Sequence, residues 1–300
     1  MARFLLKLML FSALIFGVDR LAGTLLKQGI DRYFGFDRNA AVLLVGHSHT
    51  MMGIDAGLLE RSLGMPVAKY AVNGANVFDR QAMLRQYLGD NPGRIKLVVY
   101  DVDDHTFTSD VTISNSYRLL YPYIGNADMS GYLQANAGSW GEYFSRRYLL
   151  LSLRFNAAVL NLSLRGLLGL FDNFKTGLVD ILSLEKDIQA GRRPGILIDP
   201  RYVNALEETI RLVRSRGARL VFCYIPTVDL LSRMDPARHM QVVDMFRRYD
   251  RNDDGVEFFN YQETFGSRYE LFSDAIHLNR EGQQIFTARL KMDLQPVLSQ

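Results

Sequence analysis

The sequence predicts an α/β fold, namely a flavodoxin-like three-layer sandwich with a mostly parallel sheet of about five strands. Short, mostly apolar runs alternate along the chain with segments of helical periodicity, which is the pattern of a doubly wound sheet. The first run, residues 41–45, is apolar without interruption, as expected for a strand buried on both faces. Polar residues follow several of these runs, at the sheet edge where such folds bind ligands.

The strands and helices can be placed in chain order. The expected strands are residues 41–45, 66–71, 95–102, 218–225 and 256–261. The expected helices of the sandwich are residues 51–63, 79–88, 201–216, 236–249 and 279–294. Asn91-Pro92-Gly93 ends the helix before the third strand, and Gly217 stands where a helix C-cap is expected.

Residues from about 106 to 195 interrupt this alternation, so we expect a helical insertion there. Its segment 148–170 is rich in leucine and includes Arg154 and Arg165. Such a helix either packs as a cap on the α/β domain or lies on a membrane surface or partner protein.

The N-terminus has the pattern of a membrane-targeting segment. Arg3 and Lys7 precede an uncharged apolar run, residues 8–18, which ends at Asp19. We therefore predict a signal anchor or signal peptide over residues 1–24 and one α/β domain over residues 25–300. The expected location is the bacterial inner membrane, with a single-pass anchor and the domain facing the periplasm or the cell exterior.

Composition narrows the function classes. The chain is 48% hydrophobic and 22% charged, which is typical of a globular protein. Its net charge of +3 comes without a stripe of basic residues, so no nucleic-acid partner is expected. Cys223 is the one cysteine and lies in an expected strand, which excludes a disulfide framework and a cysteine-based zinc site.

Three residues carry the arrangement needed for nucleophilic catalysis. Ser48 follows the first strand and precedes a helix, so its hydroxyl lies at the sheet edge beside outward-pointing backbone amides. Asp274 and His277 are spaced i, i+3 in the last loop, directly before the final helix. A carboxylate at this spacing can orient the imidazole, whose other nitrogen can then take a proton from the serine.

These motifs resemble those of the SGNH, or GDSL-like, hydrolase superfamily. The resemblance joins Gly46-His47-Ser48 to Asp274-Ala275-Ile276-His277 and spans about residues 40–295, apart from the insertion. It implies that Ser48 attacks an acyl ester, that His277 is the base and that Asp274 orients it. It also implies an oxyanion-hole glycine after the second strand, which matches Gly74. The Ser48 amide and either Asn73 or Asn76 are the other candidate donors of the oxyanion hole.

Two positions depart from the family pattern. An asparagine usually follows the third strand, where this chain has Asp101-Val102-Asp103-Asp104-His105 and no asparagine, and an aspartate usually stands at the position of His47. These departures are similar to those of the anchored envelope branch, which includes DltD-like and alginate O-acetylation proteins acting beside a membrane-bound O-acyltransferase. The candidates for lining the substrate site are His47, His49, Asn73, Asp103, Asp104 and His105.

The leading prediction is a serine-dependent O-acyltransferase or acyl esterase that acts on a cell-envelope or extracellular polysaccharide and needs no cofactor. The alternative is a non-catalytic partner of a membrane-bound O-acyltransferase. A weaker alternative is a metal-dependent hydrolase that uses His47 and His49. Because a turn after the first strand is expected to separate these two side chains, no metal ligand is assigned.

Overall fold

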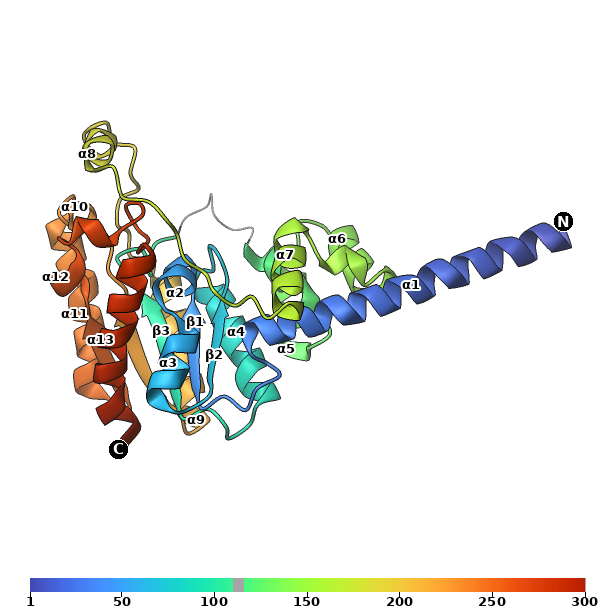
Figure 1. Ribbon diagram of the computed structural model, residues 1–300, viewed down its shortest axis with the longest axis horizontal. Coiled ribbons are helices and arrows are strands. Elements are labelled where there is room, and N and C mark those ends of the chain that lie inside the picture. Colours follow the sequence, from blue (N-terminus) through green and yellow to red (C-terminus); the bar gives the residue numbers. More distant parts are fainter. Residues whose placement is uncertain (110–115, 300) are drawn as a thin grey trace. The chain divides into compact units, whose positions relative to one another are not determined.

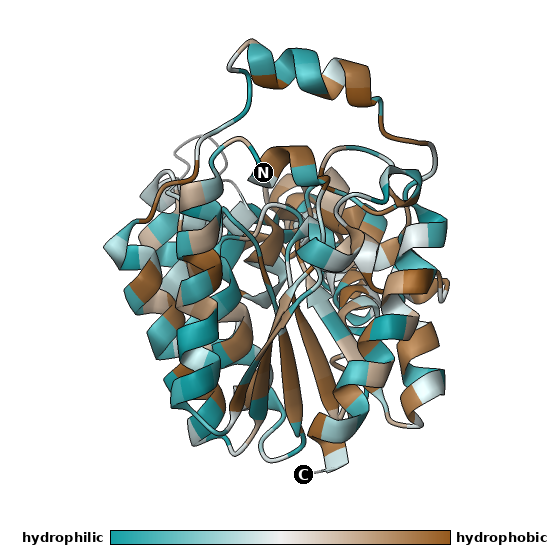
Figure 2. Ribbon diagram, turned by 90° about the vertical axis from the view of Figure 1, so that its left-hand side faces the viewer, coloured by the Kyte–Doolittle hydropathy of each residue, from teal (hydrophilic) through white to brown (hydrophobic). Residues whose placement is uncertain are grey.

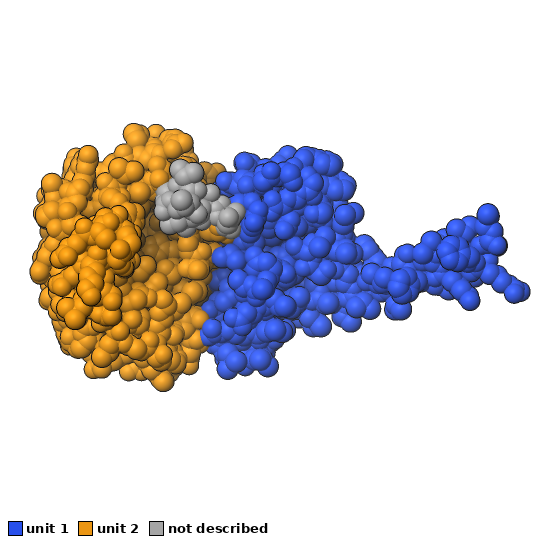
Figure 3. Space-filling model, turned by 90° about the horizontal axis from the view of Figure 1, so that it is seen from above, with its two compact units in different colours: residues 1–37, 117–171 blue, residues 38–116, 172–300 orange. Residues whose placement is uncertain are grey.

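The computed structural model describes residues 1–109 and 116–299. The chain forms two compact units, one of residues 1–37 and 117–171 and one of residues 38–116 and 172–300 (Figure 3). The second unit contains a five-stranded sheet of order β2-β1-β3-β4-β5, in which every pairing is parallel. This is the flavodoxin-like order, so the predicted fold class is confirmed.

The elements of the second unit follow the predicted alternation (Figure 1). Its strands are β1 (Val42–Gly46), β2 (Val67–Ala71), β3 (Leu97–Val102), β4 (Arg219–Tyr224) and β5 (Val256–Asn260). Its helices are α2 (Ser48–Gly53), α3 (Ala56–Leu63), α4 (Val77–Asp90), α8 (Ile181–Gln189), α9 (Pro200–Ser215), α10 (Asp229–Ser232), α11 (Pro236–Asn252), α12 (Gln262–Phe265) and α13 (Arg280–Ser299), with a 3₁₀ turn η4 (Tyr269–Leu271).

Side chains on the two faces of the sheet alternate along each strand, and each face is covered by helices. On one face Leu44, Val99 and Val221 share a register row and pack in a core with residues of α3 and α13. On the other face Tyr100 contacts Phe222, and α4, α9 and α11 cover the sheet. Figure 2 shows the strands coloured as hydrophobic over most of their length, as burial on both sides requires.

The first unit is entirely helical in its regular structure. It contains α1 (Ala2–Phe34), α5 (Ala127–Asn136), α6 (Trp140–Phe144) and α7 (Ala157–Leu167), with the turns η2 (Ser145–Leu149) and η3 (Ser152–Arg154), and η1 (Ser116–Tyr123) enters it. The segment predicted as one helix over 148–170 is therefore shorter and broken, because Asn156 caps a new helix by accepting a hydrogen bond from the Val159 amide.

Helix α1 has two distinct halves. Residues 1–18 are exposed throughout, whereas Asp19, Gly23 and Gly29 are buried in the first unit. A Cβ at Gly29 would lie 2.1 Å from the Ser163 carbonyl oxygen, so α1 and α7 cross with their backbones in contact. Within the described residues, no helix has both the length and the apolarity that crossing a membrane requires.

The insertion expected over 106–195 contributes to both units. Residues 117–171 belong to the helical unit, and residues 172–195 belong to the unit that contains the sheet.

Candidate active site

The loop before α13 holds Asp274 and His277 in a fixed arrangement. Asp274 Oδ1 accepts hydrogen bonds from the backbone amides of Ile276 and His277, each at 2.9 Å. Asp274 Oδ2 lies 2.9 Å from His277 Nδ1, so this carboxylate can hold a ring proton on Nδ1, and in that tautomer Nε2 is free to act as a base. The predicted pairing of these two residues is therefore present.

Lys175 is a third member of this group that the sequence analysis did not identify. Its Nζ lies 2.6 Å from Asp274 Oδ2 and 3.2 Å from His277 Nδ1. Burial acts to raise the pKa of Asp274, but hydrogen bonds from His277 and Lys175 outweigh it and hold that pKa well below its usual range. No local pattern could reveal Lys175, because it lies 99 residues from Asp274 in the chain.

Ser48 begins α2 directly after β1. His47 caps this helix, and its Nδ1 accepts a hydrogen bond from the His49 amide at 3.2 Å. The Thr50 amide donates to Asp101 Oδ2. Among the described residues, the Ser48 amide has no such acceptor, so it is the donor of this first turn that could hold an oxyanion.

The turn from β1 into α2 requires a glycine at residue 46, because the side chains of Thr50 and Asp101 lie where a Cβ would be. A Cβ at Gly46 would lie 2.0 Å from Thr50 Oγ1 and 2.5 Å from Asp101 Cβ. A glycine at the end of β1 therefore lets α2 start against β3 and brings Ser48 to the carboxyl end of the sheet.

The Ser48 hydroxyl and His277 do not share a hydrogen bond in this structure. His277 Nε2 is buried and has no hydrogen-bond partner among the described residues. Its ring packs edge-on against His49, with a centroid distance of 5.7 Å. Bonds between a nucleophile and its base are often long without substrate and tighten in the substrate complex.

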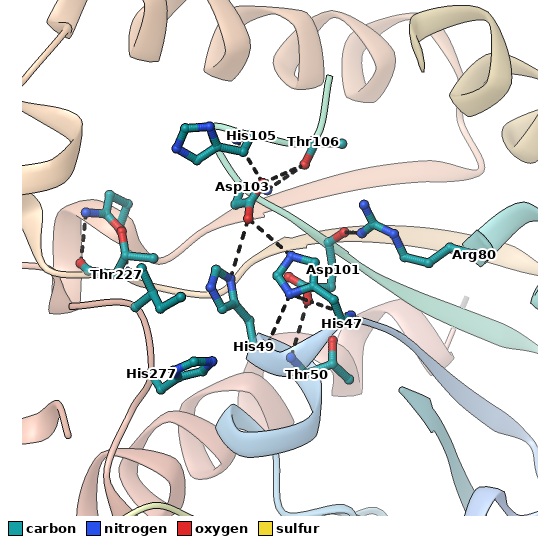
Figure 4. A network of polar contacts seen from close by, with 12 residues as sticks. His47, His49, Thr50, Arg80, Asp101, Asp103, His105, Thr106, Thr227 and His277 are labelled. Carbon is teal, nitrogen blue, oxygen red and sulfur yellow. Dashed lines mark hydrogen bonds and ion pairs between the residues drawn. The ribbon is translucent and has the colours of Figure 1, made fainter. Parts of the chain in front are cut away.

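His47, His49 and Asp103 form a compact cluster beside Ser48 (Figure 4). Asp103 Oδ2 lies 3.1 Å from His47 Nε2 and 3.7 Å from His49 Nδ1. The imidazole rings of the two histidines are 4.3 Å apart, which corrects the expectation that the turn would separate them. The reason is that His47 folds back to cap α2, which brings its ring against that of His49.

The charges of this cluster are set by burial and by its own members. Burial would raise the pKa of Asp103, but the hydrogen bond from His47 outweighs it and holds that pKa well below the usual range. Burial and the neighbouring His47 hold the pKa of His49 well below that of a free imidazole. Asp103 is therefore ionised and His49 neutral near pH 7.

Two places where the sequence departs from the motifs it resembles, His47 and the stretch after β3, contact each other through Asp103. His47 Nε2 lies 3.1 Å from Asp103 Oδ2, so the Asp103 carboxylate is paired with this imidazole.

The remaining predicted site residues fall into different environments. Gly74 has a positive φ of 73°, which suits the turn after β2, and Asn73 is exposed. Asn76 Oδ1 accepts from the amides of Phe78 and Asp79 and so caps α4, which leaves its Nδ2 as the atom available to a substrate.

Two of the predicted site residues do not join the cluster. Asp104 is 2.7 Å from Nδ1 of His239, a residue of α11 that the sequence analysis did not single out. The side chain of His105 is exposed, although its backbone amide donates to Asp103 Oδ1.

Comparison with known proteins gave structural neighbours only. No protein-family model matches the chain, and no curated protein does. Among solved structures, a protein proposed to be an acylhydrolase from Bacteroides fragilis has 10% identity and a TM-score of 0.44, covering 86% of this chain and 87% of its own. A GDSL-like lipase from Bacteroides thetaiotaomicron has 10% identity and a TM-score of 0.42, covering 86% and 89%.

A third neighbour, described as a proposed platelet activating factor from Streptococcus pneumonia, has 12% identity and a TM-score of 0.41, covering 93% of this chain and 99% of its own. All three TM-scores lie below 0.5, so these likenesses assign no activity to this chain.

Proposed function

We propose that this chain is an SGNH-type serine enzyme, an O-acyltransferase or acyl esterase whose nucleophile is Ser48. The observation that carries the proposal is the pairing of His277 Nδ1 with Asp274, which leaves His277 Nε2 as a buried, unpartnered base beside the helix that starts at Ser48.

The reaction proceeds in two halves. The Ser48 hydroxyl oxygen attacks the acyl carbonyl carbon while His277 Nε2 accepts its proton, and the amides of Ser48 and Gly74 hold the oxyanion. The protonated His277 then gives its proton to the departing alcohol, which leaves an acyl-enzyme. Water or a sugar hydroxyl, deprotonated by the same nitrogen, attacks this ester and releases Ser48.

We also propose that the substrate is an O-acylated polysaccharide of the cell envelope and that the protein is attached to the inner membrane with its catalytic unit outside the cytoplasm. Exposed apolar side chains along residues 4–18 of α1 support a membrane contact. In the same unit, Trp140 and Tyr148 are exposed, and aromatic residues of this kind favour a membrane interface.

The alternative is a non-catalytic partner of a membrane-bound O-acyltransferase. The exposed apolar surface of the helical unit would then contact the acyltransferase instead of lipid alone.

The test is active-site labelling of the full-length chain in detergent. We expect a fluorophosphonate probe to label the wild type, and a chromogenic acetyl ester to be turned over, with both activities lost in Ser48→Ala. Ser215→Ala, which changes an exposed serine of α9, is the matched control and should behave as wild type. A folded wild-type protein that shows neither labelling nor turnover would reject the stand-alone serine enzyme, and the search would turn to a membrane partner that completes or replaces the site.

A further inference from the structure

We propose that His47, His49 and Asp103 form a binding site for one divalent transition-metal ion of the zinc class. Nothing in the proposed serine chemistry requires such an ion, so the two proposals stand on different atoms and can fail separately.

The spacing of the three side chains fits this class of ion. Zinc binds imidazole nitrogen and carboxylate oxygen at about 2.0–2.2 Å, and tetrahedral geometry then separates neighbouring ligand atoms by roughly 3.3 Å. Asp103 Oδ2 lies 3.1 Å from His47 Nε2 and 3.7 Å from His49 Nδ1, and all three ligand atoms lie within 4.8 Å of one another. An ion can therefore be accommodated with small side-chain movements.

An unpartnered nitrogen at the site provides independent support. His49 is 5% exposed, and its Nδ1 has no hydrogen-bond partner among the described residues. A buried polar atom without a partner costs free energy unless something binds it. The atom faces Asp103, the residue that both histidines share (Figure 4).

The surrounding residues hold the ligands in the orientation that metal binding needs. A histidine that binds a metal through one ring nitrogen usually donates the other N–H to a carboxylate. Asp101 Oδ2 lies 3.5 Å from His47 Nδ1, and Asp101 Oδ1 is buried without a partner. Binding at His47 Nε2 would move the ring proton to Nδ1, where it points at Asp101.

Asp103, the third proposed ligand, is also held in place by hydrogen bonds to its other carboxylate oxygen. Asp103 Oδ1 accepts hydrogen bonds from the His105 amide at 2.9 Å and from the Thr106 hydroxyl at 3.1 Å, which leaves Oδ2 for the ion. Metal binding at His47 Nε2 would cost the N-terminal cap of α2, because a protonated His47 Nδ1 no longer accepts the hydrogen bond from the His49 amide. Two imidazoles and one carboxylate leave a fourth position open, as in zinc sites that also hold water or substrate.

The experiment is a metal titration of the full-length chain after chelator treatment. Bound Co²⁺ is followed by its visible absorption, which distinguishes four-coordinate from six-coordinate ions, and Zn²⁺ binding is measured by calorimetry. The variants are His49→Gln, Asp103→Asn and Asp101→Asn. The controls are His105→Gln, an exposed histidine of the same loop, and Ser48→Ala.

We expect one tightly bound ion per wild-type chain with a four-coordinate Co²⁺ spectrum. Asp101→Asn should weaken binding by about 10- to 100-fold, and removal of a ligand by at least roughly 100-fold. Both controls should bind as wild type. Because His49 Nδ1 makes no hydrogen bond, His49→Gln should keep the fold, which a thermal melt checks.

Failure to bind one ion per chain, or binding that His49→Gln and Asp103→Asn leave unchanged, overturns the proposal. Fluorophosphonate labelling of the metal-free chain reports on Ser48 separately. Labelling without metal binding rejects only the metal site, and metal binding without labelling rejects only the serine mechanism.

Discussion

At the scale of single residues, Lys175 is the feature that bears most on the proposed catalysis. Its ammonium contacts both members of the pair proposed to serve Ser48, and an isolated bridge joins Lys175 to Asn279. Two effects of this lysine oppose each other. It holds the Asp274 carboxylate in place, but its positive charge also disfavours the imidazolium that forms when His277 takes a proton.

We expect positioning to prevail, because Asp274 is only half-buried and the charge of the lysine is partly screened by water. Lys175→Met should lower kcat for an acetyl ester by about tenfold, equivalent to about 1.4 kcal/mol, with KM nearly unchanged. Lys175→Arg should restore part of the loss. Lys186→Met, at an exposed lysine of α8, is the control, and a Lys175→Met enzyme as fast as wild type would refute the positioning role.

Gly46 shows how one small residue positions Ser48, the proposed nucleophile. In Gly46→Ala the new methyl group would meet Thr50 Oγ1 and the Asp101 side chain, so the turn into α2 would have to shift. We expect the free energy of unfolding to fall by about 2 kcal/mol, as in other overpacked cores. Gly89→Ala on α4 is the control, since nothing lies within 4 Å of its added methyl group and alanine favours the helix. Urea unfolding that shifts both variants alike would contradict this account.

At the scale of elements, the crossing of α1 and α7 organises the helical unit. Gly29 and Gly166 bring the two backbones together, since a Cβ at Gly166 would lie 1.9 Å from the Gly29 carbonyl oxygen. Asp19 adds polar contacts in the same unit by accepting hydrogen bonds from the amides of Leu151 and Ser152. The second half of α1 is thus a structural part of the unit rather than a tether.

Gly29→Ala should therefore force α1 and α7 apart. We expect it to destabilise the helical unit by about 2 kcal/mol, measured as an earlier melting transition by circular dichroism. Gly17→Ala lies on the same helix with nothing within 4 Å of the new methyl group, so its melting should be unchanged or slightly later. An equal effect of the two substitutions would mean that the crossing contributes no stability.

At the scale of the whole molecule, the exposed first half of α1 is separable from the rest. Residues 1–18 are exposed, and no described helix is apolar enough over sufficient length to cross a membrane. The membrane attachment proposed above therefore predicts that these residues can be removed without unfolding the rest of the chain.

A chain lacking residues 1–18 should keep the melting behaviour of the full-length protein but lose its association with lipid vesicles. The reason is that the deletion removes exposed apolar side chains, whose burial in lipid drives binding, and ends before the first buried residue of the unit, Asp19. Flotation of both proteins with anionic vesicles measures the difference. Equal flotation would place the lipid contact elsewhere.

The sequence alone determined the architecture of the sheet unit and the pairing of Asp274 with His277. Strand burial and helix periodicity are local patterns, so five parallel strands and the helices between them could be predicted from the order of apolar and polar residues. The i, i+3 spacing of Asp274 and His277 is equally local. The prediction of Ser48 as nucleophile is tested by the labelling experiment, and the predicted membrane contact by vesicle flotation.

Only the tertiary structure decided which distant polar side chains meet. His47 and Asp103 are 56 residues apart, and Lys175 and His277 are 102 apart, so their contacts depend on strand register and on the path of the loops. Tertiary structure also divided the helical insertion between two units. The physical reason is that hydrophobic burial repeats with the period of the backbone, whereas the meeting of individual polar groups requires the three-dimensional arrangement of the whole chain.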